Sequence, residues 1–377
     1  MSWSGELDPI LKLMVRRRAS DLFVTAGLPP SLRIHGAIHA LSREALTPEG
    51  VGQTVRATMT EAQQREFEAA GEANFALSRS GIGRFRVSAF RQRGQAGMVV
   101  RRIESRVPTL EELGLPAVAG EWCGLRRGLV LVVGGAGTGK STSLAAMVEH
   151  RNQNGRGHIL TVEDPIEYIH RHGTSVVTQR EVGLDTEDYP TALRNALRQS
   201  PDVVVIGEIR SPEVMDYALG FAETGHLCLA TLHATTADQA LERILNFFPE
   251  ERHRQVRMDL AMNLHAVLAQ QLVPTRDGEG RVPATEALVR NPRAEDLIRR
   301  GHFDELKEVM GRLNQEGMHT FDQSLLEFQR AGVITARMAL AHADSPHDLR
   351  LSMRLEGGDE NLGEGLAVDE GPEPPQG

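Results

Sequence analysis

A short glycine-rich segment in the 377-residue chain constrains its fold more than any other feature. The segment fits G-x-x-x-x-G-K-[ST], in which glycines let backbone N–H groups turn toward the phosphates of a nucleotide. The lysine neutralises phosphate charge, and the following serine hydroxyl is a ligand for Mg²⁺. An apolar run precedes the segment and a helical pattern follows it, as a strand–loop–helix site requires. We therefore expect this P-loop to bind a nucleotide through Gly134, Gly135, Ala136, Gly137, Thr138, Gly139, Lys140, Ser141 and Thr142.

The net charge of −9 is concentrated at one end of the chain. Residues 356–377 hold seven acidic residues and no basic residue, which leaves −2 for the rest. This acidic, Gly- and Pro-rich tail is expected to be disordered. Because the remaining chain is almost neutral, we expect no binding to nucleic acid. No apolar run approaches the roughly 20 residues of a membrane span, so no integral membrane segment is expected. The cytoplasm is the expected location, because ATP and Mg²⁺ are available there.

Composition and periodicity divide the chain into five segments. A mixed α+β pattern over 1–106 is followed by a Pro- and Gly-containing linker over 107–122. Strands and helices alternate over 123–275, which indicates an α/β domain with a mostly parallel sheet. Helical patterns dominate 276–355, and the acidic tail covers 356–377. Within the first segment, apolar residues at 85, 87 and 89 alternate with basic or polar ones, which predicts an amphipathic strand over 83–92.

Polar side chains follow the predicted strands of the α/β domain. Glu163 follows the strand over 158–162, Glu208 follows 203–206, and His233 follows 227–231. Ligands of open α/β sheets bind beyond the carboxyl ends of the strands, so these residues are expected to converge on the P-loop. Hydrolysis of ATP needs a base that orients water and a carboxylate that supports Mg²⁺. Glu163 and Glu208 can fill these two roles, but the sequence pattern alone does not show which residue has which role.

Arginines are candidates for stabilising charge on the transferred phosphate. Arg194 and Arg198 are four residues apart and share a helix face, and Arg84, Arg86 and Arg93 belong to the predicted strand over 83–92 or its end. Each could equally be a solvated surface residue. We expect some of them to reach a phosphate between domains or subunits; the candidates are Arg84, Arg86, Arg93, Arg194, Arg198 and Arg210.

The order of these motifs resembles that of secretion ATPases. After the P-loop come segments similar to the Asp box, the atypical Walker B motif and the His box of that superfamily, at 159–167, 202–210 and 224–233. Two earlier segments, 20–27 and 83–93, are similar to the type IV pilus retraction ATPases of the PilT and PilU type. The chain looks closer to the PilU type at 151–158, 179–183, 246–251 and 318–323.

The resemblance implies a PAS-like first domain, a RecA-like ATPase core and a homohexameric ring. It implies that Glu163 is the general base, that Glu208 lies on the Mg²⁺ side with Ser141, and that His226 and His233 lie near ATP. The implied function is ATP-driven pilus retraction and twitching motility, together with a PilT-like ATPase and an inner-membrane platform protein. The implied location is the cytoplasmic side of the inner membrane, at the base of the pilus.

Two departures from the family pattern and two alternative functions remain. Gly135 replaces the usual proline of the P-loop, and 296–301 matches the retraction motif of PilT only in part, which favours an accessory motor. The chain could instead be a pilus-assembly or type II secretion ATPase, although it has no four-cysteine zinc site. It could also be a weakly hydrolysing ring subunit, against which the intact Lys140, Ser141, Glu163 and Glu208 argue.

Overall fold

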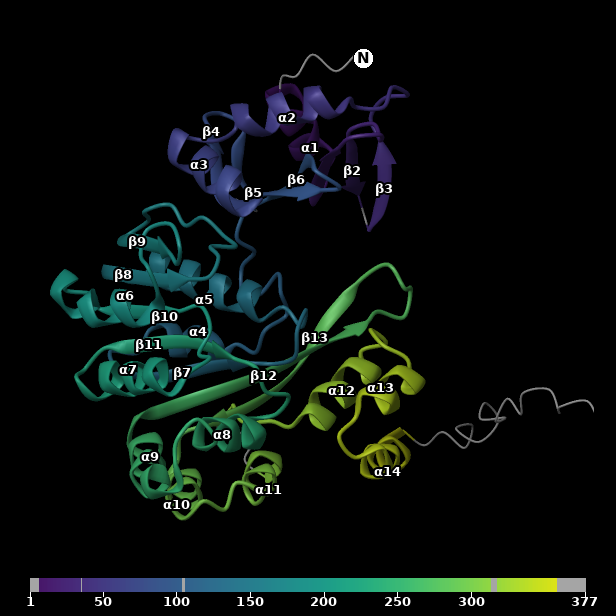
Figure 1. Ribbon diagram of the computed structural model, residues 1–377. Coiled ribbons are helices and arrows are strands. Elements are labelled where there is room, and N and C mark those ends of the chain that lie inside the picture. The colour runs from purple at the N-terminus through teal and green to yellow at the C-terminus, as the bar shows by residue number, and fades with distance from the viewer. Residues whose placement is uncertain (1–6, 35, 104–105, 313–316, 358–377) are drawn as a thin grey trace, which may run out of the picture. The chain divides into compact units, whose positions relative to one another are not determined.

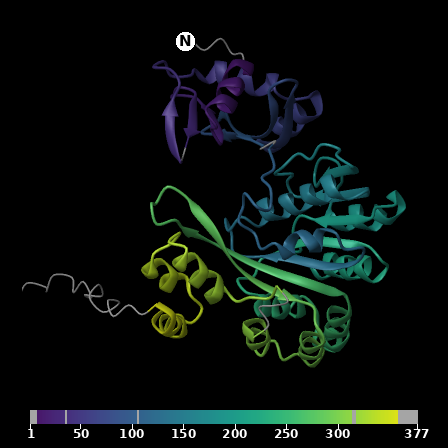
Figure 2. The same cartoon turned by 180° about the vertical axis from the view of Figure 1, so that it is seen from behind.

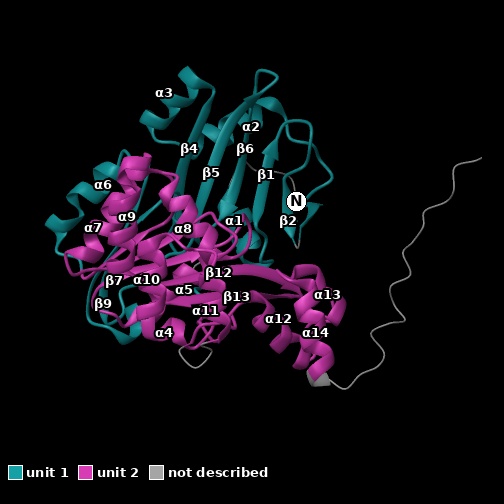
Figure 3. Ribbon diagram, turned by 90° about the horizontal axis from the view of Figure 1, so that it is seen from below, with its two compact units in different colours: residues 1–108, 151–201 teal, residues 109–150, 202–377 magenta. Residues whose placement is uncertain are grey.

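The computed structural model describes residues 7–34, 36–103, 106–312 and 317–357. The chain forms two compact units, coloured separately in Figure 3. Unit 1 contains residues 1–108 and 151–201, and unit 2 contains 109–150 and 202–377. The acidic tail over 356–377, which we predicted to be disordered, lies outside the described residues except for residues 356 and 357. No helix among the described residues is long and apolar enough to cross a membrane.

The first part of unit 1 is an antiparallel sheet covered by helices (Figure 1). The strand order is β3-β2-β1-β6-β5-β4. The strands are β1 (Asp21–Thr25), β2 (Ser31–Ile34), β3 (Ala37–Ala40), β4 (Glu72–Arg79), β5 (Gly83–Gln92) and β6 (Gln95–Arg102). The helices are α1 (Asp8–Arg16), α2 (Pro48–Ala57) and α3 (Glu61–Ala70), whose apolar faces share one core with the sheet.

The alternation predicted for the arginine strand is confirmed in β5. Phe85, Val87 and Ala89 are buried in the core of the sheet, whereas Arg84 and Arg86 are partly exposed. A side chain on a strand points to the face opposite its neighbour's, so apolar burial forces the arginines outward. Local residues also set the two ends of helix α3. Thr60 forms a capping box at its start, and Gly71, with φ of 77°, ends it.

The second part of unit 1 contains the parallel strands β8 (Gly157–Glu163) and β9 (Ser175–Glu181), followed by α6 (Tyr189–Ala196) and the 3-10 helix η1 (Leu197–Gln199). The sequence pattern predicted β8 and missed β9. Strand β9 has buried and partly exposed positions without a continuous apolar run, so its hydrophobic signal is weak. The Asp164–Pro165 peptide bond after β8 is cis.

Unit 2 is built on a mostly parallel sheet. Strands β10, β11, β7 and β12 are parallel neighbours in the order β12-β7-β11-β10, and β13 pairs antiparallel with β12. Their bounds are β7 (Gly128–Val133), β10 (Val203–Ile206), β11 (Leu227–Leu232), β12 (Leu264–Pro274) and β13 (Arg281–Val289). Every residue of β7, β10 and β11 is buried, as is usual for strands covered on both faces. The α/β fold and these three predicted strands are confirmed.

Helices surround this sheet and continue to the end of the described chain. The helices around the strands are α4 (Val118–Cys123), α5 (Lys140–Asn154), α7 (Pro212–Glu223), α8 (Ala237–Leu245) and α9 (Glu250–Asn263). The later ones are α10 (Pro292–Arg300), α11 (Leu306–Arg312), α12 (Phe321–Arg330), α13 (Ala336–His342) and α14 (Pro346–Gly357). The helical patterns expected within 276–355 correspond to α10–α13.

The helical patterns that dominate residues 276–355 in the sequence miss one strand, β13. Figure 2 shows β12 and β13 as a long hairpin beside the later helices. Strand β13 is almost continuously buried, and a short buried segment gives no periodicity that separates strand from helix. This hairpin matters for the site, because it supplies two buried polar side chains that sequence reasoning did not find.

Candidate nucleotide site

The P-loop joins the end of β7 to the first residue of α5, and its backbone leaves little room for side chains. A Cβ atom at Gly134 would lie 2.4 Å from Thr138 Oγ1 and 2.5 Å from the Gln270 carbonyl oxygen. Gly139 has φ of 89°, and a Cβ there would lie 2.8 Å from Gln270 Nε2. The loop therefore needs glycine at both positions, and its turn brings backbone N–H groups to the amino end of α5, where phosphate binds favourably.

Lys140 is buried at the start of α5 and reaches back over the loop. Its Nζ donates a hydrogen bond to the Gly135 carbonyl oxygen at 2.7 Å and lies 3.5 Å from His233 Nδ1. The lysine side chain is thus held against the loop by a backbone carbonyl of the loop itself. The P-loop and Lys140 therefore fit the phosphate chain of a nucleotide.

Three polar side chains from the carboxyl ends of β10 and β11 meet beside Lys140. His233 Nε2 lies 2.9 Å from Glu208 Oε1, and Arg210 Nε donates to Glu208 Oε2 at 2.8 Å. Since His233 also approaches Lys140 Nζ, the cluster connects the P-loop lysine to the Glu208 carboxylate. The expected convergence of strand ends thus holds for Glu208 and His233. Arg210, a candidate phosphate contact, is paired with Glu208 in this structure.

Magnesium would find only a few protein ligands here. Ser141 is in the first turn of α5, and Glu208 supplies carboxylate oxygens. Nowhere in the described ranges do three or more His, Cys, Asp or Glu side chains form a metal-binding group. Mg²⁺ commonly binds through one or two protein ligands, phosphate oxygens and water. A hydroxyl and a carboxylate therefore fit Mg²⁺ bound with a nucleotide, and do not fit a closed protein cage.

His226 is separated from this cluster within the chain, so its expected place near a nucleotide stays a prediction. It precedes β11, and its carbonyl oxygen accepts a hydrogen bond from the N–H of Gly128, the first residue of β7. Because β7 and β11 are parallel and paired along their length, His226 lies at their amino ends, whereas the P-loop follows the carboxyl end of β7. Its Nδ1 instead contacts Thr224 Oγ1 at 3.1 Å.

Gln270 is a P-loop contact that sequence reasoning missed. Its buried side chain projects from β12, where Nε2 donates to the Thr138 carbonyl oxygen at 2.7 Å. Its Oε1 accepts a hydrogen bond from Ser143 Oγ at 2.7 Å. One amide thus fixes both the loop and the first turns of α5. A glutamine within an apolar strand pattern was the available signal, since a buried amide requires polar partners.

Glu163, at the end of β8 in unit 1, is held by two side chains. Its Oε1 accepts hydrogen bonds from Thr161 Oγ1 at 2.6 Å and from Gln179 Nε2 at 3.1 Å. Burial raises the pKa of the Glu163 carboxyl above its ordinary value, although both hydrogen bonds oppose this change. A raised carboxyl pKa brings proton affinity closer to that needed by a general base. The catalytic role of Glu163 remains a prediction.

The remaining candidate arginines of unit 1 lie in different surroundings. Arg84 lies 3.8 Å from Glu181, and Arg86 lines a pocket of about 350 Å³ together with Arg101, Arg102 and Glu167. Arg93 is exposed in the turn between β5 and β6, and Arg194 and Arg198 are exposed on α6 and η1. Of the candidate arginines, Arg86 lines this pocket, where Arg101 and Arg102 add further positive charge. Contacts of the candidate arginines with phosphate stay predictions.

Comparison with known proteins identifies the family. The model of the family described as type II/IV secretion system protein matches residues 5–331. The chain belongs to this family. Within it, the chain is 57% identical to the type IV pilus ATPase PilU of Pseudomonas aeruginosa, over 93% of this chain and 92% of PilU. It is 38% identical to PilT, a type IV pilus retraction ATPase of the same organism, over 91% of this chain and 99% of PilT.

A solved structure of this family matches the fold. The crystal structure of the pilus retraction motor PilT with bound ADP superposes with a TM-score of 0.85 and 39% sequence identity. The match covers 91% of this chain and 98% of the PilT chain. The predicted similarity to pilus ATPases, and to PilU in particular, is therefore confirmed.

Proposed function

We propose that this protein is an ATP-hydrolysing motor that powers pilus retraction and twitching motility in the manner of PilU. The observation that carries the proposal is the cluster in which His233 bridges the P-loop lysine and Glu208. The names of the relatives indicate the process that the motor drives, since PilU is a type IV pilus ATPase and PilT is a retraction ATPase. The greater identity to PilU favours a motor that acts with a PilT-like partner.

We assign a separate role in ATP hydrolysis to each residue of the site. P-loop N–H groups and Lys140 bind the β- and γ-phosphates, and Ser141 and Glu208 hold Mg²⁺. When bound, Mg²⁺ neutralises charge that develops on the phosphates. Glu163 orients the attacking water and accepts its proton, while His233 senses the γ-phosphate and keeps Glu208 in position. The candidate arginines, with Arg86 first among them, supply positive charge to the transferred phosphate.

The organisation of the chain follows the same proposal. We assign residues 1–106 to a PAS-like domain, 107–122 to a linker, 123–275 to a RecA-like core and 276–355 to a helical subdomain, followed by an acidic tail over 356–377. Six copies form a ring on the cytoplasmic side of the inner membrane. There the ring engages a platform protein at the base of the pilus.

The first test is ATP turnover by the purified protein and two variants. Lys140→Ala removes the charge that binds phosphate, so we expect turnover and nucleotide affinity both to fall by about 100-fold or more. Glu163→Gln preserves shape and removes the base, so we expect a similar loss of kcat with nucleotide affinity within about threefold of wild type. Wild-type turnover in either variant would contradict the assigned roles.

The motor function requires a cellular test. Deletion of the gene, with and without deletion of the gene for a PilT-like partner, is scored for pilus retraction under load. Complementation with wild type should restore retraction, and complementation with Lys140→Ala should not. Normal retraction in every deletion strain would exclude the proposed function.

A further inference from the structure

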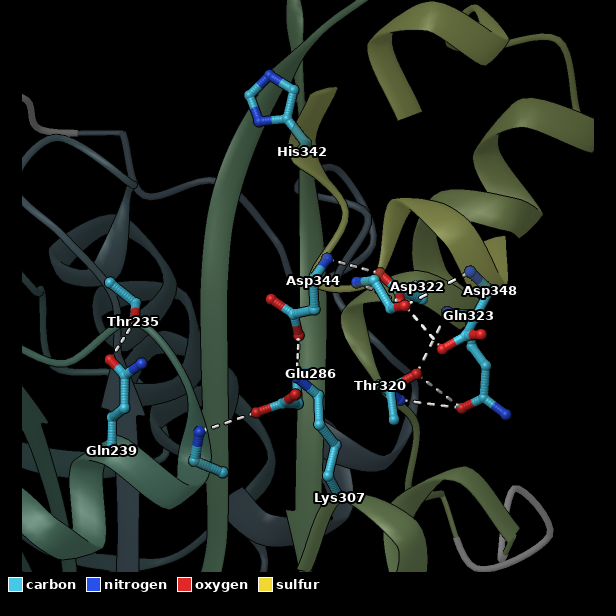
Figure 4. Close-up of polar contacts among 12 residues, drawn as sticks. Thr235, Gln239, Glu286, Lys307, Thr320, Asp322, Gln323, His342, Asp344 and Asp348 are labelled. Carbon is cyan, nitrogen blue, oxygen red and sulfur yellow. Dashed lines mark hydrogen bonds and ion pairs between the residues drawn. The ribbon is translucent and has the colours of Figure 1, made fainter. Parts of the chain in front are cut away.

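A buried glutamate on the β12–β13 hairpin has no part in the chemistry described above. Glu286, in β13, has a relative exposure of 0%. Its Oε1 accepts a hydrogen bond from the backbone N–H of Ala237 at 2.8 Å, as Figure 4 shows. Its Oε2 is buried and has no hydrogen-bond partner among the described residues, and the same holds for Thr236 Oγ1. A buried carboxyl with one unused oxygen is costly and needs an explanation.

The bonded N–H group belongs to the first turn of a helix. Ala237 begins α8, and Thr236 occupies the N-cap position without making a side-chain cap. Glu286 therefore replaces the usual cap with a carboxylate from a strand 49 positions later in the chain. Negative charge at a helix amino end is favourable because N–H dipoles point toward it. The contact fixes where α8 starts.

The start of α8 is connected to the nucleotide site by a very short segment. Only Ala234, Thr235 and Thr236 separate it from His233, which contacts Glu208 and approaches Lys140. Four Cα–Cα steps lead from His233 to Ala237 and span at most about 14 Å. The backbone of Ala237 and the His233 side chain therefore lie on one short stretch of chain.

On its other side, Glu286 faces charges from the C-terminal helices. Lys307 of α11 lies near it and forms an ion pair of 2.6 Å with Asp344 (Figure 4). Asp322 of α12 in turn accepts hydrogen bonds from the N–H groups of Asp344 and Ser345. Burial raises the pKa of Glu286 to about 7; Asp344 and Asp238 also raise it, while the Ala237 hydrogen bond and Lys307 lower it.

We propose that Glu286 is a positioning residue, which places His233 through the start of α8 and couples the nucleotide site to the C-terminal helices. The inference rests on the proposed ATPase function. In its ionised form Glu286 makes a charge-assisted bond to Ala237 N–H and attracts Lys307, and in its protonated form both interactions weaken. The position of His233 is therefore best defined at a pH where Glu286 is ionised.

The test compares ATP turnover of wild type, Glu286→Gln and Glu286→Leu between pH 6 and 8.5. Glutamine keeps an acceptor for Ala237 N–H but cannot ionise, whereas leucine removes the acceptor. We expect Glu286→Leu to lower kcat about tenfold with the KM for ATP nearly unchanged, because a small misplacement near the reacting groups affects chemistry more than binding. Glu286→Gln should lose the part of the rise in kcat that wild type shows as pH passes about 7.

Asp348→Asn is the matched control. Asp348 is also a carboxylate bonded near a helix start, through Ser345 Oγ at 2.7 Å, but it is exposed on α14. We expect this variant to keep the kcat, KM and pH profile of wild type. If Glu286→Leu fails to fold, as judged by thermal unfolding, the pH profile of Glu286→Gln decides.

Two failures are distinguishable. Absence of ATP turnover in wild type would refute the proposed function. Wild-type turnover with an identical pH profile in Glu286→Gln would overturn the inference about Glu286 and leave the ATPase function standing.

Discussion

Neighbouring glycines of the P-loop differ in how much room a side chain would have. Gly134 lies so close to Thr138 and the Gln270 backbone that no side chain fits. At Gly135, where the family pattern has proline, a Cβ would meet only Thr138 Cγ2 at 3.7 Å, an ordinary contact. The structure therefore provides room at Gly135, and what this residue contributes to the site is its carbonyl oxygen, which accepts from Lys140.

This difference predicts opposite outcomes for two alanine substitutions. Gly134→Ala forces the loop to move, and we expect ADP affinity to fall by about tenfold or more. Gly135→Ala requires no movement, and affinity should stay within about twofold of wild type. Calorimetric titration with ADP measures both. Equal affinities in the two variants would show that close packing at Gly134 does not shape the site.

At the scale of elements, strand β12 supports the P-loop through Gln270. Gln270→Leu preserves volume but leaves the Thr138 carbonyl and the Ser143 hydroxyl without this partner. Unpaired buried polar groups cost about 1–3 kcal/mol each, so we expect weaker ADP binding and lower thermal stability. Gln271→Leu is the control, because Gln271 donates to the His342 carbonyl at the other side of the strand. A loss of ADP affinity in the control alone would contradict this role.

The elements also explain what the sequence pattern could and could not predict. Strands β7, β10 and β11 are continuous apolar runs bounded by turns, so the polar residues at their carboxyl ends, Glu208 and His233, were predictable. The partners of Gln270 and Glu286 were not predictable, because they lie 49 or more positions away in the chain and no local periodicity encodes them. The position of His226 was expected only from the family resemblance, and within this chain β11 separates it from His233.

At the scale of the whole molecule, burial of Glu286 makes stability depend on pH. Its pKa is about 7 in the folded protein against an ordinary value of 4.5. The folded state thus retains a proton that the unfolded state releases. The stabilising contribution is complete below about pH 4.5 and is lost as pH rises to about 7, a change of about 3 kcal/mol.

Glu286→Gln cannot lose this proton, so its free energy of unfolding should increase relative to wild type between pH 5 and pH 8. Denaturation followed by the fluorescence of Trp122, which is buried in unit 2, measures the difference in a Trp3→Phe background. A difference that is the same at both pH values would show that Glu286 titrates normally. The protonated form of Glu286 thus favours stability, whereas the proposed positioning of His233 needs the ionised form.

The path of the chain through its two units restricts how such a motor can be rearranged. The chain passes from one unit to the other after residues 108, 150 and 201, and the second of these points falls inside α5. Exchanging unit 1 between two relatives therefore needs three junctions, one of them in the middle of a helix that begins at the P-loop lysine. Recombination between related genes would seldom meet this requirement, so the two units are expected to be inherited together.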